Sequence, residues 1–312
     1  MSLAEDGTWV RKADMPTARE YLSTCVVDGI IYAIGGYTGN HSRVFSAVEA
    51  YNPATDSWTK KADMPTARGG LSASVVNGII YAIGGWDVGE RLLTTVEAYD
   101  PATDTWTKKA DMPYPGSVSS SMVNGIIYAI GGSHTHAYDP ATDAWTRKAD
   151  MPTPRYNLST SEVNGIIYAI GGSIGFTGFS TVEAYDPATD TWTRKADMPT
   201  GRDSFSTSVV NGMIYAIAGF ELSRLSALSS VEAYDPAMDT WTRKANAPTS
   251  REGVSTCAAN GRIYAIGGYS RPPYRELPVV EEYTVLPAPG RSTKPVDAKK
   301  VATLWGRIKV AN

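Results

Sequence analysis

Residues 99–113 read YDPATDTWTKKADMP, and close copies of this stretch recur along the chain. Further copies begin at Tyr51, Tyr138, Tyr185 and Tyr234, and in each of them a Trp follows the Tyr by seven residues. A shortened copy with Trp9 stands near the start. The six tryptophans are 49, 48, 39, 47 and 49 residues apart: Trp9, Trp58, Trp106, Trp145, Trp192 and Trp241. A period of this length predicts a repeat protein.

One unit of the repeat contains four strand signals. Residues 71–76 are small or apolar and lead into Asn77-Gly78, a dipeptide that favours a two-residue hairpin turn. Residues 79–84 follow as the second strand, a variable loop comes next, and residues 95–100 form the third. The turn PATD then leads to a fourth strand at residues 105–109. Four antiparallel strands in such a unit are typical of a propeller blade.

With its paired glycines, its Tyr–Trp spacing and its Asp-Pro turns, the sequence resembles the Kelch-repeat family over about residues 8–285. The resemblance implies an all-β fold, a six-bladed β-propeller of four-stranded antiparallel blades. It does not fix an activity, because one fold serves many functions. The glycine pairs, one of them Ala-Gly, are Gly35-Gly36, Gly84-Gly85, Gly131-Gly132, Gly171-Gly172, Ala218-Gly219 and Gly267-Gly268.

The ends of the repeat predict how the ring closes. The last unit has three strand signals and no Trp, whereas residues 8–12 form a lone fourth strand. We expect residues 8–12 to complete the last blade, because closure pairs an edge that would otherwise stay open. We assign residues 1–286 to the propeller and residues 287–312 to a Pro-rich linker and a basic tail. The expected blades are 20–62, 69–110, 116–149, 156–196, 203–245 and 252–285.

Composition narrows the classes of partner. The chain has 312 residues, a net charge of −3 and 20% charged residues, which suits a soluble globular protein. The near-neutral balance argues against a nucleic-acid partner, and no apolar run is long enough to span a membrane. No signal peptide is visible, so we expect either a cytoplasmic protein or the mature form of an exported one. We also expect a monomer.

Cys25 and Cys257 occupy equivalent positions in the first and last units, which closure makes neighbours. Two buried free thiols and a disulfide both remain open, since a disulfide has demanding geometry.

Six serines share one register in the first strand of each unit. Only small side chains fit where six inner strands converge, and their hydroxyls can bond nearby backbone. We therefore interpret the serines as structural. They are Ser23, Ser72, Ser119, Ser159, Ser206 and Ser255.

Variation between the units gathers in the loop between the second and third strands, and ligands of repeat scaffolds bind where loops vary. The loop that enters the first strand shares this face. It carries an arginine in five units, with Pro115 in the matching place of the third. Aromatic residues follow the glycine pair in four units. The candidate ligand-binding residues are therefore Arg19, Arg68, Arg155, Arg202, Arg251, Tyr37, Trp86, Phe220 and Tyr269.

Two interpretations of the arginines remain open. They could form a basic ring at the mouth of the channel, which resembles the pocket of Kelch adaptors that bind acidic peptides. They could instead pair with local carboxylates and hold the loops. Acidic residues directly follow Arg19, Arg202 and Arg251, so Arg68 and Arg155 are the better ligand candidates.

The sequence is compatible with three functions. The first is a non-catalytic binding module for a peptide, a protein or another anionic ligand on the variable-loop face. The second is an acidic-sugar binder or mutarotase, since some six-bladed Kelch propellers resemble sialic-acid mutarotases. The third is a structural repeat scaffold. We expect no cofactor, and no nucleophile elbow or P-loop motif is present.

His134 and His136 are weak candidates for metal ligands. Their H-x-H spacing puts both side chains on one face of a strand. Two imidazoles alone are too few for a structural zinc site, so we expect no metal here.

Overall fold

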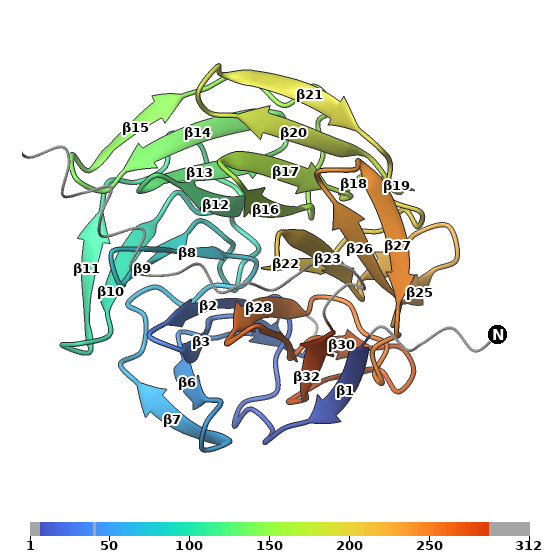
Figure 1. The fold of residues 1–312 in the computed structure, drawn as a ribbon. Coiled ribbons are helices and arrows are strands. Elements are labelled where there is room, and N and C mark those ends of the chain that lie inside the picture. Colours follow the sequence, from blue (N-terminus) through green and yellow to red (C-terminus); the bar gives the residue numbers. More distant parts are fainter. Residues whose placement is uncertain (1–6, 40–41, 287–312) are drawn as a thin grey trace, which may run out of the picture.

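A computed structural model describes residues 7–39 and 42–286, and every regular element in them is a strand. Six four-stranded antiparallel sheets stand around a central channel (Figure 1). The predicted all-β, six-bladed propeller is therefore confirmed. The predicted linker and basic tail, residues 287–312, lie outside the described residues.

The first three blades each run outward from the channel in chain order. Blade one contains β2 (Ser23–Val27), β3 (Ile30–Ile34), β6 (Val48–Asn52) and β7 (Ser57–Lys61). Blade two contains β8 (Ser72–Val76), β9 (Ile79–Ile83), β10 (Val96–Asp100) and β11 (Thr105–Lys109). Blade three contains β12 (Ser119–Val123), β13 (Ile126–Gly131), β14 (His134–Asp139) and β15 (Ala144–Arg147).

The other three blades repeat this order, except that the outer strand of the last comes from the start of the chain. Blade four contains β16 (Ser159–Val163), β17 (Ile166–Ile170), β20 (Val182–Asp186) and β21 (Thr191–Lys195). Blade five contains β22 (Ser206–Val210), β23 (Met213–Ile217), β26 (Val231–Asp235) and β27 (Thr240–Lys244). Blade six contains β28 (Ser255–Ala259), β29 (Arg262–Ile266), β32 (Val280–Val285) and β1 (Gly7–Arg11).

Four of the variable loops carry a short hairpin of their own. These hairpins are β4 (Tyr37–Thr38) with β5 (Arg43–Val44), β18 (Ser173–Ile174) with β19 (Thr177–Gly178), β24 (Phe220–Glu221) with β25 (Ser226–Ala227), and β30 (Tyr269–Ser270) with β31 (Arg275–Glu276).

The ring closes as the sequence predicts. Strand β1 lies beside β32 (Figure 1). The two pair antiparallel, and Trp9 stands opposite Tyr283. The same register joins Tyr99 to Trp106 in blade two. The Trp9 indole Nε1 donates to the carbonyl of Ala245 in blade five at 3.1 Å, so β1 also contacts the neighbouring blade.

The hydrophobic core lies between neighbouring blades. Ile34 and Val48 of blade one pack with Ile80 and Tyr99 of blade two, and all four side chains are fully buried. Because every blade presents both of its faces to neighbours, its second strand is buried on both sides. Cys25 and Cys257 are buried free thiols in this core, so no disulfide joins them.

Serine hydroxyls tie the innermost strands into an unbroken ring. The Oγ of each predicted serine accepts a hydrogen bond from a main-chain N–H of the next blade, at 2.9–3.1 Å. The structural interpretation of these serines is thus confirmed. The acceptor–donor pairs are Ser23 with Ala73, Ser72 with Ser120, Ser119 with Thr160, Ser159 with Thr207, Ser206 with Thr256, and Ser255 with Thr24.

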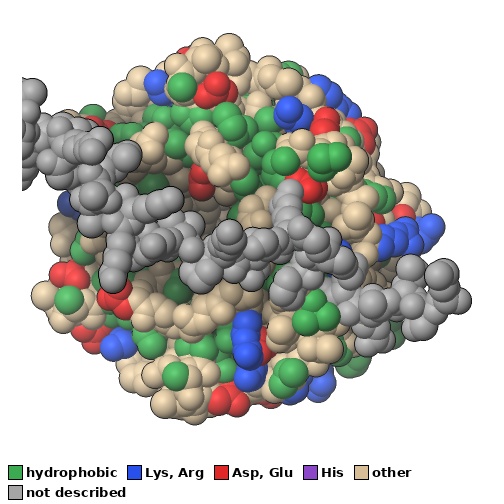
Figure 2. Space-filling view, in the orientation of Figure 1, with side chains coloured by type: hydrophobic (Ala, Val, Ile, Leu, Met, Phe, Trp, Pro, Cys, Tyr) green, Lys and Arg blue, Asp and Glu red, His purple; other side chains and the backbone are tan. Residues whose placement is uncertain are grey.

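Charged side chains cover the outside of the ring. Figure 2 shows most Lys and Arg side chains near the rim of this view, where the outermost strands run. Such charges discourage edge-to-edge pairing of exposed strands. The described residues contain no helix with the length and apolar character that a membrane span requires.

Candidate functional site at the mouth of the channel

The five arginines of the predicted basic ring are fully buried. Each forms an ion pair with a glutamate on the third strand of its own blade, and in four of them the N–O distance is 2.5–3.1 Å. The pairs are Arg19–Glu49, Arg68–Glu97, Arg155–Glu183, Arg202–Glu232 and Arg251–Glu281.

Each arginine joins two blades, as Arg68 illustrates. Its carbonyl accepts from the Gly36 N–H of blade one at 3.0 Å. Its guanidinium donates to the Ala82 carbonyl at 3.1 Å and to Glu97 at 2.9 Å, both in blade two. Burial lowers the pKa of Arg68 to about 10, so the group stays charged at neutral pH.

This geometry corrects the predicted ligand ring. A guanidinium with no exposed surface and a carboxylate partner has no donor to offer a ligand in this conformation. The structural alternative, in which the arginines hold the loops, describes all five. Arg68 and Arg155, the favoured ligand candidates, are as buried as the others.

Blade three lacks both members of the ion pair. Gly116, not Pro115, stands in the arginine position, because its carbonyl accepts from the Gly85 N–H at 3.0 Å as Arg68 does from Gly36. The predicted alignment was therefore wrong by one residue. His136 replaces the glutamate, opposite Ala129 in the register.

An aromatic cluster takes the place of that ion pair. The Tyr114 ring lies 4.7 Å from the ring of His134 and 5.0 Å from that of His136. Burial lowers the pKa of His136, which favours the neutral imidazole. Across the described ranges, no three His, Cys, Asp or Glu side chains gather in a way that could hold a metal ion.

The four predicted aromatic residues do reach the variable-loop face. Tyr37 and Phe220 are more than nine-tenths buried, whereas Trp86 and Tyr269 are half-buried. Each forms a main-chain bridge with the residue after the arginine position, and in three blades that residue is acidic. The bridges are Tyr37 with Glu20, Trp86 with Gly69, Phe220 with Asp203, and Tyr269 with Glu252.

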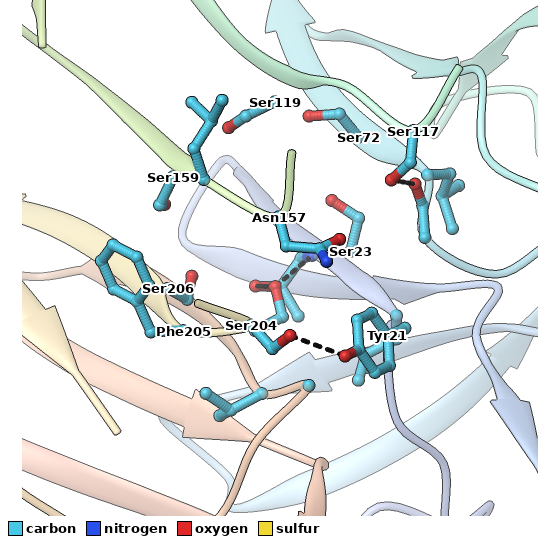
Figure 3. Close-up of a pocket in the computed structure, with 18 of the residues that line it drawn as sticks. Tyr21, Ser23, Ser72, Ser117, Ser119, Asn157, Ser159, Ser204, Phe205 and Ser206 are labelled. Atoms are coloured by element: carbon cyan, nitrogen blue, oxygen red, sulfur yellow. Dashed lines mark hydrogen bonds between the residues drawn. The ribbon is translucent and has the colours of Figure 1, made fainter. Parts of the chain in front are cut away.

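Tyr21 is the residue at the mouth that the sequence analysis missed. Its ring stacks on Tyr37 at 5.3 Å and lies 5.7 Å from the Trp86 ring. Its hydroxyl and that of Ser204 in the loop before blade five share a hydrogen bond of 2.7 Å, which Figure 3 shows across the mouth. Equivalent positions hold only glycine, serine or asparagine, so the repeat pattern does not mark it.

The channel itself is narrow and polar. A cavity of about 210 Å³ is lined by serine hydroxyls of all six blades, with Tyr21, Asn157 and Ser204 around its mouth (Figure 3). Because the hydroxyls already bond neighbouring backbone, this space suits water better than an organic ligand.

Two larger hollows adjoin the channel mouth, and Tyr21 lines both. One, of about 330 Å³, lies among Tyr21, Tyr37, Trp86, Glu90, Leu92 and Asn157. The other, of about 640 Å³, lies between blades six and one and is lined by Glu20, Tyr21, Tyr37, Gly39, Glu252, Tyr269, Arg271, Tyr274 and Glu276. The carboxylates make the second hollow acidic, which is the opposite of the predicted basic mouth.

Most of the exposed large apolar side chains in the described residues lie in loops of this face. Eleven large hydrophobic residues are exposed in the described chain, and seven of them lie in the variable loops or the loops that enter the first strands. Phe176 is 96% exposed at the tip of the β18–β19 hairpin. The seven are Val88, Leu92, Tyr156, Ile174, Phe176, Leu225 and Tyr274.

Comparisons with known proteins agree with this architecture. A family model described as the Kelch motif matches residues 18–65 and 67–113. A second, described as the KLHDC2/KLHL20/DRC7 Kelch-repeats domain, matches residues 133–268. A solved structure titled "Structure of YjhT" superposes with a TM-score of 0.73 over 85% of this chain and 95% of that one, at 15% identity. At this identity the likeness concerns the fold alone.

Proposed function

We propose, because this chain belongs to the Kelch-repeat β-propeller family, that it is a non-catalytic binding module. It holds a peptide segment of a protein partner on the variable-loop face, at the mouth of the channel. The proposal gives the repeated scaffold a structural role and the variable loops the recognition role.

One observation carries the proposal, the concentration of exposed apolar side chains on that face. Solvent-exposed aromatic and aliphatic groups that gather on one surface of a soluble protein typically mark a contact with another macromolecule. Seven of the eleven exposed large hydrophobic residues belong to these loops, and Phe176 and Leu225 are exposed by 96% and 73%.

The hollows beside Tyr21 supply the pockets that such a contact needs. Tyr37 and Trp86 line the smaller one, and Tyr37 with Tyr269 lines the larger. Partly desolvated aromatic rings next to polar groups are the usual anchors of protein interfaces. Peptide side chains of ordinary size fit these volumes.

An acidic sugar or an acidic peptide is less well supported. Either ligand was expected to bind the five arginines, whose guanidinium groups are buried and paired. The larger hollow beside Tyr21 is lined by three glutamates and one arginine, a balance that also disfavours an anion.

Selection of a displayed random peptide library on the purified chain tests this proposal. Selected peptides are then titrated against wild type, a Phe176→Ser/Leu225→Ser variant and a Met238→Ser control. Met238 is 68% exposed in the turn between the third and fourth strands of blade five, on the opposite face.

We expect the loop variant to weaken binding by about tenfold and the control to leave it unchanged. Peptides that bind the loop variant as tightly as wild type would refute a site on this face. So would a library that yields no peptide with micromolar affinity.

A further inference from the structure

The hollow between blades six and one carries more negative than positive charge. Its described lining includes the carboxylates of Glu20, Glu252 and Glu276 but one cationic side chain, Arg271. Glu276 accepts from the Gly39 N–H at 2.6 Å, and Arg271 pairs with Glu252 at 2.5 Å. The described carboxylates of this hollow therefore outnumber its cation.

Glu20 is a buried acidic residue that lines this hollow. Glu20 is 6% exposed. Arg271, which is hydrogen-bonded to Glu252, is the cation whose charge acts on the Glu20 carboxyl group. Burial, together with nearby Glu252 and Glu276, raises the pKa of Glu20 to about 8. A carboxyl group that is costly to ionise and lines a hollow is typical of ligand-binding sites.

Arg271 shows which chemistry this environment accepts. Its Nε donates to Glu252 Oε1, and its Cζ lies 5.0 Å from the centre of the Phe220 ring and 5.5 Å from that of Tyr269. A planar guanidinium is thus already held on a carboxylate between aromatic rings. Cation–π contact and a charge-assisted hydrogen bond both favour a guanidinium in such a place.

We propose that this hollow binds the guanidinium of an arginine side chain from the partner peptide, paired with Glu20 and placed against the tyrosine rings. The inference rests on the proposed function and names the chemistry of its ligand. Arginine fits better than lysine because its charge is planar, weakly hydrated and able to stack on aromatic faces. It also fits a rim whose carboxylates repel acidic ligands.

Saturation-transfer NMR with two small probes tests the inference independently of any selected peptide. The probes are N-acetylarginine amide and N-acetylcitrulline amide, which have nearly the same shape but differ in charge. We expect saturation transfer to the arginine probe and at least about fivefold weaker binding of the citrulline probe. Equal binding of the two would overturn the proposal, and N-acetyllysine amide that binds as well as the arginine probe would overturn the preference for a guanidinium.

Three variants locate the binding. Glu20→Gln keeps the shape of the side chain and should weaken binding of the arginine probe by about fivefold or more. Arg271→Ala removes a competing cation and should strengthen binding of the arginine probe at pH 9, where the Glu20 carboxyl group is ionised. Asp28→Asn is the matched control, because Asp28 lies in the hairpin turn of blade one on the opposite face, where the other units carry Asn. An unchanged affinity in Glu20→Gln, or a loss in Arg271→Ala, would contradict the site.

The pH dependence gives a signature that a structural role for Glu20 would not produce. A cation binds the ionised carboxylate, so the affinity of the arginine probe should rise between pH 6 and pH 9 in wild type and stay flat in Glu20→Gln. The groups that face Glu20 are Glu252, Glu276, Arg271 and the tyrosines of the hollow. Burial raises the pKa values of Tyr21, Tyr37 and Tyr269, and the charge on Glu252 helps to raise that of Arg271.

The two proposals fail in different ways. In the first case, Glu20→Gln leaves the affinity of the arginine probe unchanged while selected peptides still bind the Phe176→Ser/Leu225→Ser variant more weakly. The cation site is then wrong, and the proposed binding face is supported. If the arginine probe behaves as expected while selected peptides ignore the loop variant, the hollow binds guanidinium but the proposed protein-binding face is wrong.

Discussion

At the scale of single residues, the buried arginines act as internal ligands of the protein. The Arg68 guanidinium bonds Glu97 and two main-chain carbonyls, so its donors are used inside the blade. When one partner of a buried ion pair is removed, the other is left as an uncompensated charge, which costs about 3–5 kcal/mol.

Arg68→Ala should therefore lower the free energy of unfolding by about 3–5 kcal/mol, as measured by denaturant titration. Arg91→Ala in the same blade is the control, because Arg91 pairs with Asp87 with its side chain 77% exposed. Such an exposed pair contributes little to stability. Equal stability of the two variants would mean that the buried ion pair of Arg68 contributes no more to stability than the exposed pair of Arg91.

The raised pKa of Glu20 predicts that the stability of the protein depends on pH. The pKa of Glu20 is raised to about 8 by burial, so the folded state favours the protonated form. A group with a raised pKa costs stability progressively as pH rises toward that value, by about 1.4 kcal/mol per pH unit at most.

Glu20→Gln should consequently stabilise the ligand-free chain more at pH 9 than at pH 6. We expect the difference between the two pH values to be about 2 kcal/mol, from denaturant titrations at both. Asp28→Asn provides the baseline. A stabilisation by Glu20→Gln that is the same at both pH values would mean that Glu20 does not titrate in this range.

At the scale of elements, Gly85 allows the loop that enters the first strand of blade two to approach the end of the second strand closely. Gly85 has φ +96°, and a Cβ there would lie 2.5 Å from the Gly69 carbonyl oxygen. Gly78 has φ +79° in a hairpin turn, but a Cβ there meets nothing within 4 Å. The two positions therefore separate backbone strain from a steric clash.

Gly85→Ala should destabilise the chain by several kcal/mol, whereas Gly78→Ala should cost only about 1 kcal/mol for its left-handed backbone. Thermal melting of the two variants compares these costs directly. Similar melting temperatures would show that the loop beside Gly69 yields easily.

The repeat makes the elements predictable and leaves the site harder to predict. The hairpin dipeptides and the Tyr–Trp spacing fix strands and register, because each unit confirms the others. Whether Arg68 faces solvent or the blade depends on where a flexible side chain reaches, which spacing does not encode. One feature of the sequence nevertheless indicated that the arginine and the glutamate pair. Blade three lacks both residues, which is expected if they are partners.

The alignment error at Pro115 and the oversight of Tyr21 have local causes. Blade three is one residue shorter between Met112 and Val118 than blade two is between Met64 and Leu71, which shifts the matching position to Gly116. Tyr21 matters because its ring folds over Gly253, where a Cβ would lie 2.8 Å from it. That contact joins blades one and six and is invisible in a single unit.

At the scale of the whole molecule, stability depends on the closure of blade six by β1. Five residues of β1 pair with β32, and the Trp9 indole reaches blade five. Deletion of residues 1–13 removes both contacts and exposes the edge of β32.

We expect this deletion to lower the melting temperature by about 10 °C or more, as measured by calorimetry or dye fluorescence. Deletion of residues 1–6, which leaves β1 in place, is the control. A melting curve that the longer deletion does not change would refute the closure.

The pairing of β1 with β32 also sets the order of events during synthesis. Gly7 pairs with Val285, so 278 residues separate the partners along the chain. At ordinary translation rates, Val285 is synthesised on the order of tens of seconds after Gly7. During that interval five blades can assemble into an arc on the ribosome while β1 has no partner. The sheet that completes the circle is thus the last to form, although its outer strand precedes all other described strands in the chain.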